Sequence, residues 1–123
     1  MFKKALIIVA FLTAGVTGLL ADDWIGTFWG DARGEWKGTI YADQDPIIFK
    51  GTWVNDAGEE GALYAEGEII GSDYVFEKGD AYNSDGVLVG HWSGKFPIWT
   101  DAYVTGPWEG LHGESGKWGG YRP

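Results

Sequence analysis

Residues able to do acid–base or nucleophilic chemistry are spread along this 123-residue chain without forming a recognisable catalytic set. The paired carboxylates Glu59-Glu60 and Asp22-Asp23 are most simply solvated turn or terminal residues. A glycosidase needs two carboxylates held roughly 5–9.5 Å apart across a cleft. Nothing in the spacing of these pairs predicts such a cleft.

The two histidines, His91 and His112, each stand alone in the sequence, on a predicted outward strand face and in a predicted turn. Zinc sites need three or four ligands at defined spacings, and neither histidine has such neighbours. Ser115 lies near His112 but lacks the strand–turn–helix context of a nucleophile elbow. The chain has no cysteine to act as a nucleophile. We therefore expect a protein that is not an enzyme, with no metal site and no cofactor.

The segment DAYNSDG, from Asp80 to Gly86, has the oxygen-rich composition of a calcium loop. With Gly86 at position six, Asp85 and Asn83 would be ligands five and three, but position one is Ala81, which has no side-chain oxygen. Asn-Ser-Asp-Gly is also a common hairpin turn. A turn is the prediction, and loose calcium binding by it is the alternative.

Aromatic side chains are the remaining candidates for binding. Those on the outward face of their predicted strands include Trp29, Trp99, Tyr103 and Tyr121. Exposed aromatic rings on a rigid sheet stack on sugars or on partner side chains. We predict Trp29, Trp99 and Tyr103 as the ligand- or partner-binding residues. The alternative is that they form a second packed layer or an oligomer contact.

These residues must be positioned by a repeated unit. Gly-x-aromatic, once in a degenerate form, recurs at Gly26, Gly51, Gly79 and Gly106, at intervals of 25, 28 and 27 residues. The second and fourth copies share the most positions, and each copy reads as strand, turn, strand. Period-two alternation then predicts about eight strands, at 24–30, 34–41, 47–54, 61–70, 73–81, 86–96, 98–108 and 115–121.

Large apolar residues flank a glycine in most of these strands, as in Trp36-Lys37-Gly38-Thr39-Ile40. A mid-strand glycine weakens a sheet unless an aromatic ring from a neighbouring strand covers it. The pattern therefore predicts an all-β, antiparallel meander of four hairpin repeats, either an open curved sheet or a small up-and-down barrel. Its core would contain the aromatic residues on the glycine-bearing face, namely Trp24, Phe28, Trp36, Trp53, Trp92 and Trp108.

The first 21 residues have the charged start, short apolar run and small final residue of a secretory signal peptide, which we expect to be helical. An uncleaved anchor is the alternative. Residues 22–123 would then form one domain, secreted or periplasmic and not spanning a membrane. This domain carries all 18 acidic residues and seven of the nine basic ones, for a net charge of −11. Such a surface repels nucleic acid and anionic lipid headgroups.

The segment from Phe49 to Asn55, FKGTWVN, with Gly58, Gly61 and Tyr64 after it, resembles a MORN repeat. The resemblance implies successive hairpins in an open, twisted sheet that serves as an interaction scaffold. Gly51-Thr52-Trp53-Val54-Asn55 also resembles the first-strand motif of avidin–streptavidin barrels, and Gly-x-Trp marks the first strand of lipocalins. This second likeness implies a closed barrel.

The functional prediction is a secreted, non-enzymatic binding or scaffolding module whose partner is a protein or a cell-envelope component. The alternative is a small-ligand or carbohydrate-binding β-barrel, in which case the partner includes a glycan or another small molecule. A subunit of a homo-oligomer is a third interpretation.

Overall fold

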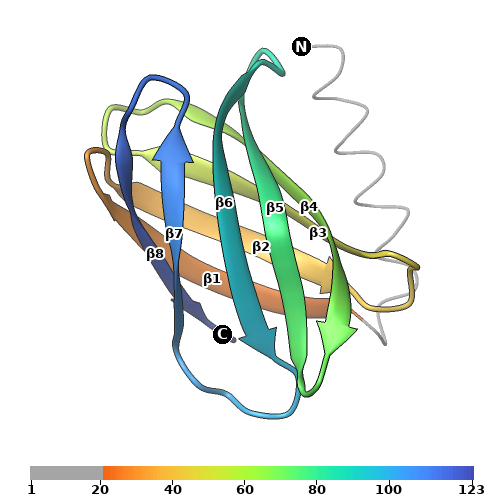
Figure 1. Ribbon diagram of the computed structural model, residues 1–123. Helices are drawn as coiled ribbons and strands as arrows, with labels where there is room; N and C mark the ends of the chain where they lie inside the picture. Colours follow the sequence, from red (N-terminus) through yellow and green to blue (C-terminus); the bar gives the residue numbers. More distant parts are fainter. Residues whose placement is uncertain (1–20) are drawn as a thin grey trace.

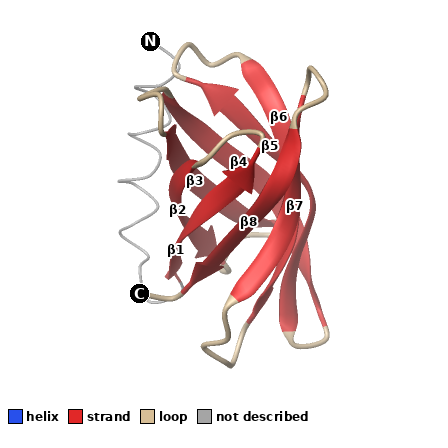
Figure 2. Cartoon of the chain, turned by 90° about the vertical axis from the view of Figure 1, so that its left-hand side faces the viewer, coloured by secondary structure: helices blue, strands red, loops and turns tan. Residues whose placement is uncertain are grey.

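The computed structural model describes residues 21–123, which form eight antiparallel strands and no helix. The strands are β1 (Ala21–Gly30), β2 (Gly34–Tyr41), β3 (Ile47–Asn55), β4 (Glu60–Ile70), β5 (Asp73–Asn83), β6 (Leu88–Pro97), β7 (Val104–Gly110) and β8 (Ser115–Tyr121). Each strand pairs with the next, and β8 pairs with β1. The meander is thus a closed barrel (Figures 1 and 2), and of the two architectures predicted, the barrel is the correct one.

The predicted strand pattern is confirmed at most positions, with one clear error. The predicted seventh strand, 98–108, begins only at Val104, and residues 98–103 form a loop. In this loop the carbonyl groups of Ile98 and Thr100 accept hydrogen bonds from the side chain of Arg122, and the amide of Ile98 donates to the carbonyl of Ser72. The predicted leader lies outside the described residues except for Ala21, which begins β1 and pairs with Tyr41.

The predicted covering of glycines by aromatic rings is present throughout the barrel. A Cβ on Gly79 would lie 2.2 Å from Cε2 of Trp92, and a Cβ on Gly94 would lie 2.2 Å from Cζ2 of Trp118. No side chain other than hydrogen fits beneath these rings. Bare glycine backbone therefore gives five inward-facing indoles, those of Trp36, Trp53, Trp92, Trp108 and Trp118, a flat surface on another strand.

The indole N–H groups also reach across strands. Trp53 on β3 lies over Gly61 on β4 and donates to the carbonyl of Tyr82 on β5, at 3.0 Å. Trp108 on β7 lies over Gly116 on β8 and donates to the carbonyl of Trp29 on β1, at 3.1 Å. The equivalent second and fourth repeats thus make the same contact. Both indoles link strands that are not direct neighbours.

The inward faces at one end of the barrel form a packed aromatic core. Its most deeply buried large side chains are Trp24, Ile40, Phe49, Phe76 and Phe96. Phe49 contacts four other rings, including Phe96 in a stacked geometry with the centroids 5.8 Å apart. This end, called the closed end below, contains the loops at residues 42–46, 71–72 and 98–103 and both ends of the described chain (Figure 1).

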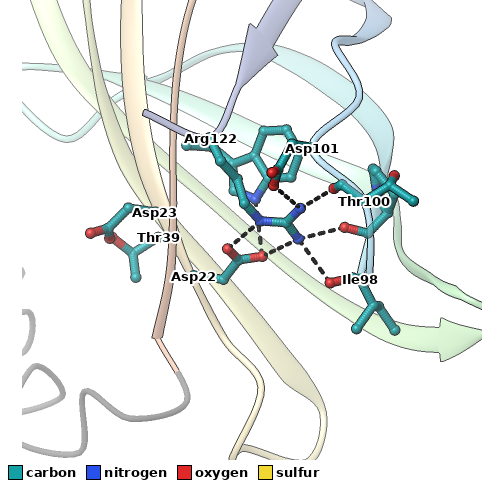
Figure 3. Close-up of polar contacts among 9 residues, drawn as sticks. Asp22, Asp23, Thr39, Ile98, Thr100, Asp101 and Arg122 are labelled. Carbon is teal, nitrogen blue, oxygen red and sulfur yellow. Dashed lines mark hydrogen bonds and ion pairs between the residues drawn. The ribbon is translucent and has the colours of Figure 1, made fainter.

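Arg122, which follows β8, fastens the closed end (Figure 3). Its Nε and Nη2 donate to the two carboxylate oxygens of Asp22 at 2.7 and 2.9 Å. It also donates to the carbonyls of Pro97, Ile98 and Thr100, and its Cζ lies 4.6 Å from the centroid of the Trp24 ring. The hydrogen bonds to Asp22 raise the pKa of the guanidinium above its ordinary value, against the opposing effect of burial. We call this set of contacts the Arg122 latch.

The barrel wall is weakest between β6 and β7, where only three residue pairs are in register: Gly90↔Gly110, His91↔Glu109 and Trp92↔Trp108. The next residue of β7 toward the closed end is Pro107, which has no amide proton to donate to β6. The carbonyl of Ser93 instead accepts from the indole of Trp118, at 2.9 Å. A side chain thus replaces part of the backbone ladder.

No helix within residues 21–123 is long and apolar enough to cross a membrane.

Candidate ligand-binding cavity

The end of the barrel opposite the closed end is hollow. The four hairpin turns at residues 31–33, 56–59, 84–87 and 111–114 all lie at this end of the barrel, called the mouth below (Figure 1). A cavity of about 270 Å³ extends inward from it. Its lining comes from β1 through β8, so that only closure of the whole barrel creates it.

Small inward residues create this cavity. Leu63 on β4 pairs with Ala81 on β5, Ala81 with Gly90 on β6, and Gly90 with Gly110 on β7. This row of one leucine, one alanine and two glycines crosses four neighbouring strands at the level of the mouth, and all four residues line the cavity. At the closed end the inward positions carry large aromatic side chains instead. The difference in side-chain volume leaves one half of the barrel filled and the other half hollow.

Five aromatic rings from the core form the floor of the cavity: Trp36, Phe49, Trp92, Phe96 and Trp118. Trp36 and Trp118 meet edge to face with centroids 5.5 Å apart, and Phe96 stacks on Trp118 at 5.3 Å. Rings packed in this way are held by many neighbours and cannot move singly without opening voids. The floor is therefore a rigid, apolar surface.

Three half-buried rings, Phe28, Trp53 and Trp108, form the wall near the mouth. Phe28 lies between the two tryptophans and meets each edge to face, with centroid separations of 6.5 and 6.2 Å. Because both indole N–H groups donate to backbone carbonyls, the two tryptophans present ring carbon to the cavity. The wall therefore offers a ligand aromatic surface and no hydrogen-bond donor.

Three polar residues of the lining, Asn55, Glu59 and Glu114, lie at the rim of the cavity. Asn55 caps the β3–β4 turn, where its Oδ1 accepts from the amides of Ala57 and Glu59 and its Nδ2 donates to Oε1 of Glu59 at 2.9 Å. In the β7–β8 turn, Oε1 of Glu114 accepts from the amide of His112 at 3.1 Å. Glu59 and Glu114, which occupy equivalent positions in the two repeats, are both part of the cavity lining.

None of the three predicted binding residues lines the cavity. Trp29 lies on the outer face of β1, and it contacts Gly119 of β8 from outside together with Tyr103, whose hydroxyl lies closest to that glycine. Trp99 lies in the loop before β7, with 82% of its surface exposed. The structure therefore brings Trp29 and Tyr103 together but corrects the placement of Trp99 on a strand face.

The remaining candidates are explained by local structure. Asn83 forms a turn in which its Oδ1 accepts from the amides of Asp85 and Val87, so the segment before Gly86 is the predicted hairpin turn. His91 is exposed on β6, and its Nδ1 lies 3.1 Å from Oδ1 of Asp80. Across residues 21–123, no three His, Asp or Glu side chains are grouped closely enough to hold a metal ion.

Comparison of this chain with protein-family models, curated proteins and solved structures found no match. The function must therefore be inferred from the chemistry of the cavity and of the surface.

Sequence reasoning missed most of the cavity. Phe28, Trp53 and Trp108 are predicted as core; they pack against the core, but they are only half-buried and form a wall of the cavity. Trp118 was not among the predicted core residues, although its alignment with inward-facing Leu63 in the second repeat was a usable signal. Ala81 and Gly90 gave no signal, because small residues become a cavity only when the strands around them are known.

Proposed function

We propose that this protein binds a small, largely apolar molecule in the mouth of its barrel. The cavity of about 270 Å³, closed at the bottom by rigid aromatic rings and open at the mouth, is the observation that carries the proposal. Binding sites for small molecules are typically preformed, concave and lined by hydrophobic and aromatic side chains. A dry cavity of about 150 Å³ accommodates benzene, so this one suits a molecule somewhat larger than a single ring.

The proposal is tested by filling the cavity from one side. Ala81→Phe places a ring in the row of small residues, and Ala62→Phe places the same ring on the outer face of the neighbouring strand, β4. We expect 4-phenylbutan-1-ol to change the tryptophan fluorescence of the wild-type protein saturably and to give a measurable heat by calorimetry. Ala81→Phe should weaken this binding at least tenfold, because the phenyl group of the probe and the new ring would occupy the same volume.

The control, Ala62→Phe, should bind as the wild type does. Absence of saturable binding to the wild-type protein by a series of neutral aromatic and alkyl probes would refute the proposal. Equal binding by the two variants would place the site elsewhere on the protein.

A scaffolding role is the second candidate, and exposed aromatic side chains near the closed end support it. Trp99 and Tyr103 expose 82% and 59% of their surfaces, respectively. Aromatic side chains with so large an exposed fraction are typical of surfaces that contact other proteins or sugars. The partner would be a protein or cell-envelope component, a glycan, or a second copy of the chain.

Trp99→Ala combined with Tyr103→Ala tests this role without changing the cavity. We expect the double variant to lose any concentration-dependent association that the wild-type protein shows by light scattering, and any retention on immobilised glycans. Binding of 4-phenylbutan-1-ol should be unchanged. Identical behaviour of variant and wild type in both surface assays would count against the role of these two residues.

A further inference from the structure

The chemical character of the lining narrows the kind of ligand. The residues that line the cavity include no lysine, arginine, serine, threonine or tyrosine, and the exposed side chain of their one histidine, His91, lies against the carboxylate of Asp80. Trp36, Trp53, Trp92, Trp108 and Trp118 all line it, and each indole N–H already donates to a backbone carbonyl. The amide nitrogen of Asn55 donates to Glu59. A bound carboxylate or phosphate would therefore lose water without gaining a charged or free indole donor, which is strongly unfavourable.

The rim has the opposite character. The four turns around the mouth carry one arginine, Arg33, and no lysine, against the five acidic residues Asp31, Asp56, Glu59, Asp85 and Glu114. Glu59 and Glu114 are placed in the lining itself, on the two hairpins that also supply Trp53 and Trp108. An acidic rim around an apolar opening raises the local concentration of cations and repels anions.

Aromatic rings directly below this rim favour the same charge. The faces of tryptophan and phenylalanine carry negative electrostatic potential and attract ammonium groups within about 6 Å of the ring centroid. Phe28, Trp53 and Trp108 form such a group of rings at the level of the mouth. A cation held there would contact aromatic carbon on one side and the rim carboxylates and water on the other.

On this basis, and resting on the proposed function, we propose that the ligand is a cationic amphiphile. It has an apolar body that fills the space above the floor rings and a protonated amine or quaternary ammonium group that stays at the mouth. The head group lies near Glu59 and Glu114 and against the wall rings. This arrangement leaves the charge partly hydrated, so the cost of desolvating it is small.

Three probes of one shape test the charge preference: 4-phenylbutylammonium, 4-phenylbutan-1-ol and 4-phenylbutyrate. We expect calorimetry at pH 7 and low salt to show the ammonium compound binding roughly tenfold more tightly than the alcohol, and the carboxylate more weakly than either. The preference for the ammonium compound should shrink at 0.5 M salt, because rim charges are exposed to screening.

Glu59→Gln combined with Glu114→Gln tests the residues. Each glutamine keeps the Oε1 that accepts the hydrogen bond within its turn. The matched control, Glu68→Gln with Glu77→Gln, removes two exposed charges from the outer wall toward the closed end. We expect the rim variant to lose most of the tenfold preference, measured as the ratio of its affinities for the ammonium compound and the alcohol, and the control to retain it.

The outcomes separate the two proposals. If the alcohol binds as tightly as the ammonium compound, or if the rim and control variants behave alike, the cavity binds ligands without the charge selectivity and this inference is wrong. If the carboxylate binds most tightly, it is also wrong. If none of the three probes binds, the proposed function fails together with the inference.

Discussion

Gly79→Ala is expected to lower the free energy of unfolding by about 3 kcal/mol, at the upper end of the cost of overpacking a core. The added methyl group would lie 2.2 Å from Cε2 and 2.4 Å from Cδ2 of Trp92, well inside van der Waals contact. Trp92 is buried and cannot simply move away. It packs against Phe49 at 4.8 Å and contacts Phe76 and Trp118 at 6.1 and 6.4 Å between centroids. Urea unfolding followed by circular dichroism measures the effect.

A double-mutant cycle separates this clash from any general effect of alanine on the strand. In a Trp92→Leu background the ring is absent, so Gly79→Ala should cost little, and the coupling free energy should be about 2–3 kcal/mol. In an unhindered strand, alanine would be expected to stabilise slightly by restricting the unfolded chain. An equal cost in both backgrounds would show that the indole does not depend on the glycine, and the physical basis given for this barrel would be wrong.

Arg122→Met should also destabilise the barrel strongly, by about 3 kcal/mol. Both side chains of the Arg122–Asp22 ion pair are less than one-fifth exposed, and removing one partner leaves the other partly buried charge without compensation. Three backbone carbonyls and the Trp24 ring lose their partner as well. Chemical denaturation gives the energy, and hydrogen exchange at residues 98–101 should show earlier opening of the loop before β7.

Two further variants locate the cause. Arg122→Lys keeps the charge but has no planar fork for the two oxygens of Asp22, so it should recover only a small part of the loss. Arg33→Met removes an exposed arginine from the β1–β2 turn and should change stability by less than about 0.5 kcal/mol. Stability of Arg122→Met equal to that of Arg33→Met would mean that the latch contributes nothing.

The amino-acid pattern predicted the local features of this fold well. Alternation along Leu88, Gly90, Trp92 and Phe96 correctly assigned one face of β6 to the interior, although the predicted strand began two residues early. Glycines between large apolar residues correctly predicted rings lying over bare backbone. These are properties of a strand and its neighbours, and a period of two together with a missing Cβ is enough to indicate them.

Features that join distant parts of the chain could not be predicted in this way. Closure depends on the pairing of β1 with β8, in which Gly26 lies opposite Gly120. Arg122 determines the loop before β7 through partners that are 22 to 25 residues away in sequence and through Asp22, which is 100 residues away. Nothing near Arg122 indicates these contacts. The cavity follows from closure, so it could not be predicted either, although several residues that line it were correctly predicted to face inward.

The indole hydrogen bonds of Trp53 and Trp108 connect the two halves of the barrel, β1–β4 and β5–β8. Trp53 belongs to the first four strands and bonds to Tyr82 in the last four, while Trp108 belongs to the last four and bonds to Trp29 in the first four. Each junction between the halves, β4 with β5 and β8 with β1, is therefore bridged by the same device. The barrel therefore resembles two four-stranded halves, each of which donates an indole hydrogen bond to the other. The covalent connection at residues 71–72 is only one of the links between these halves.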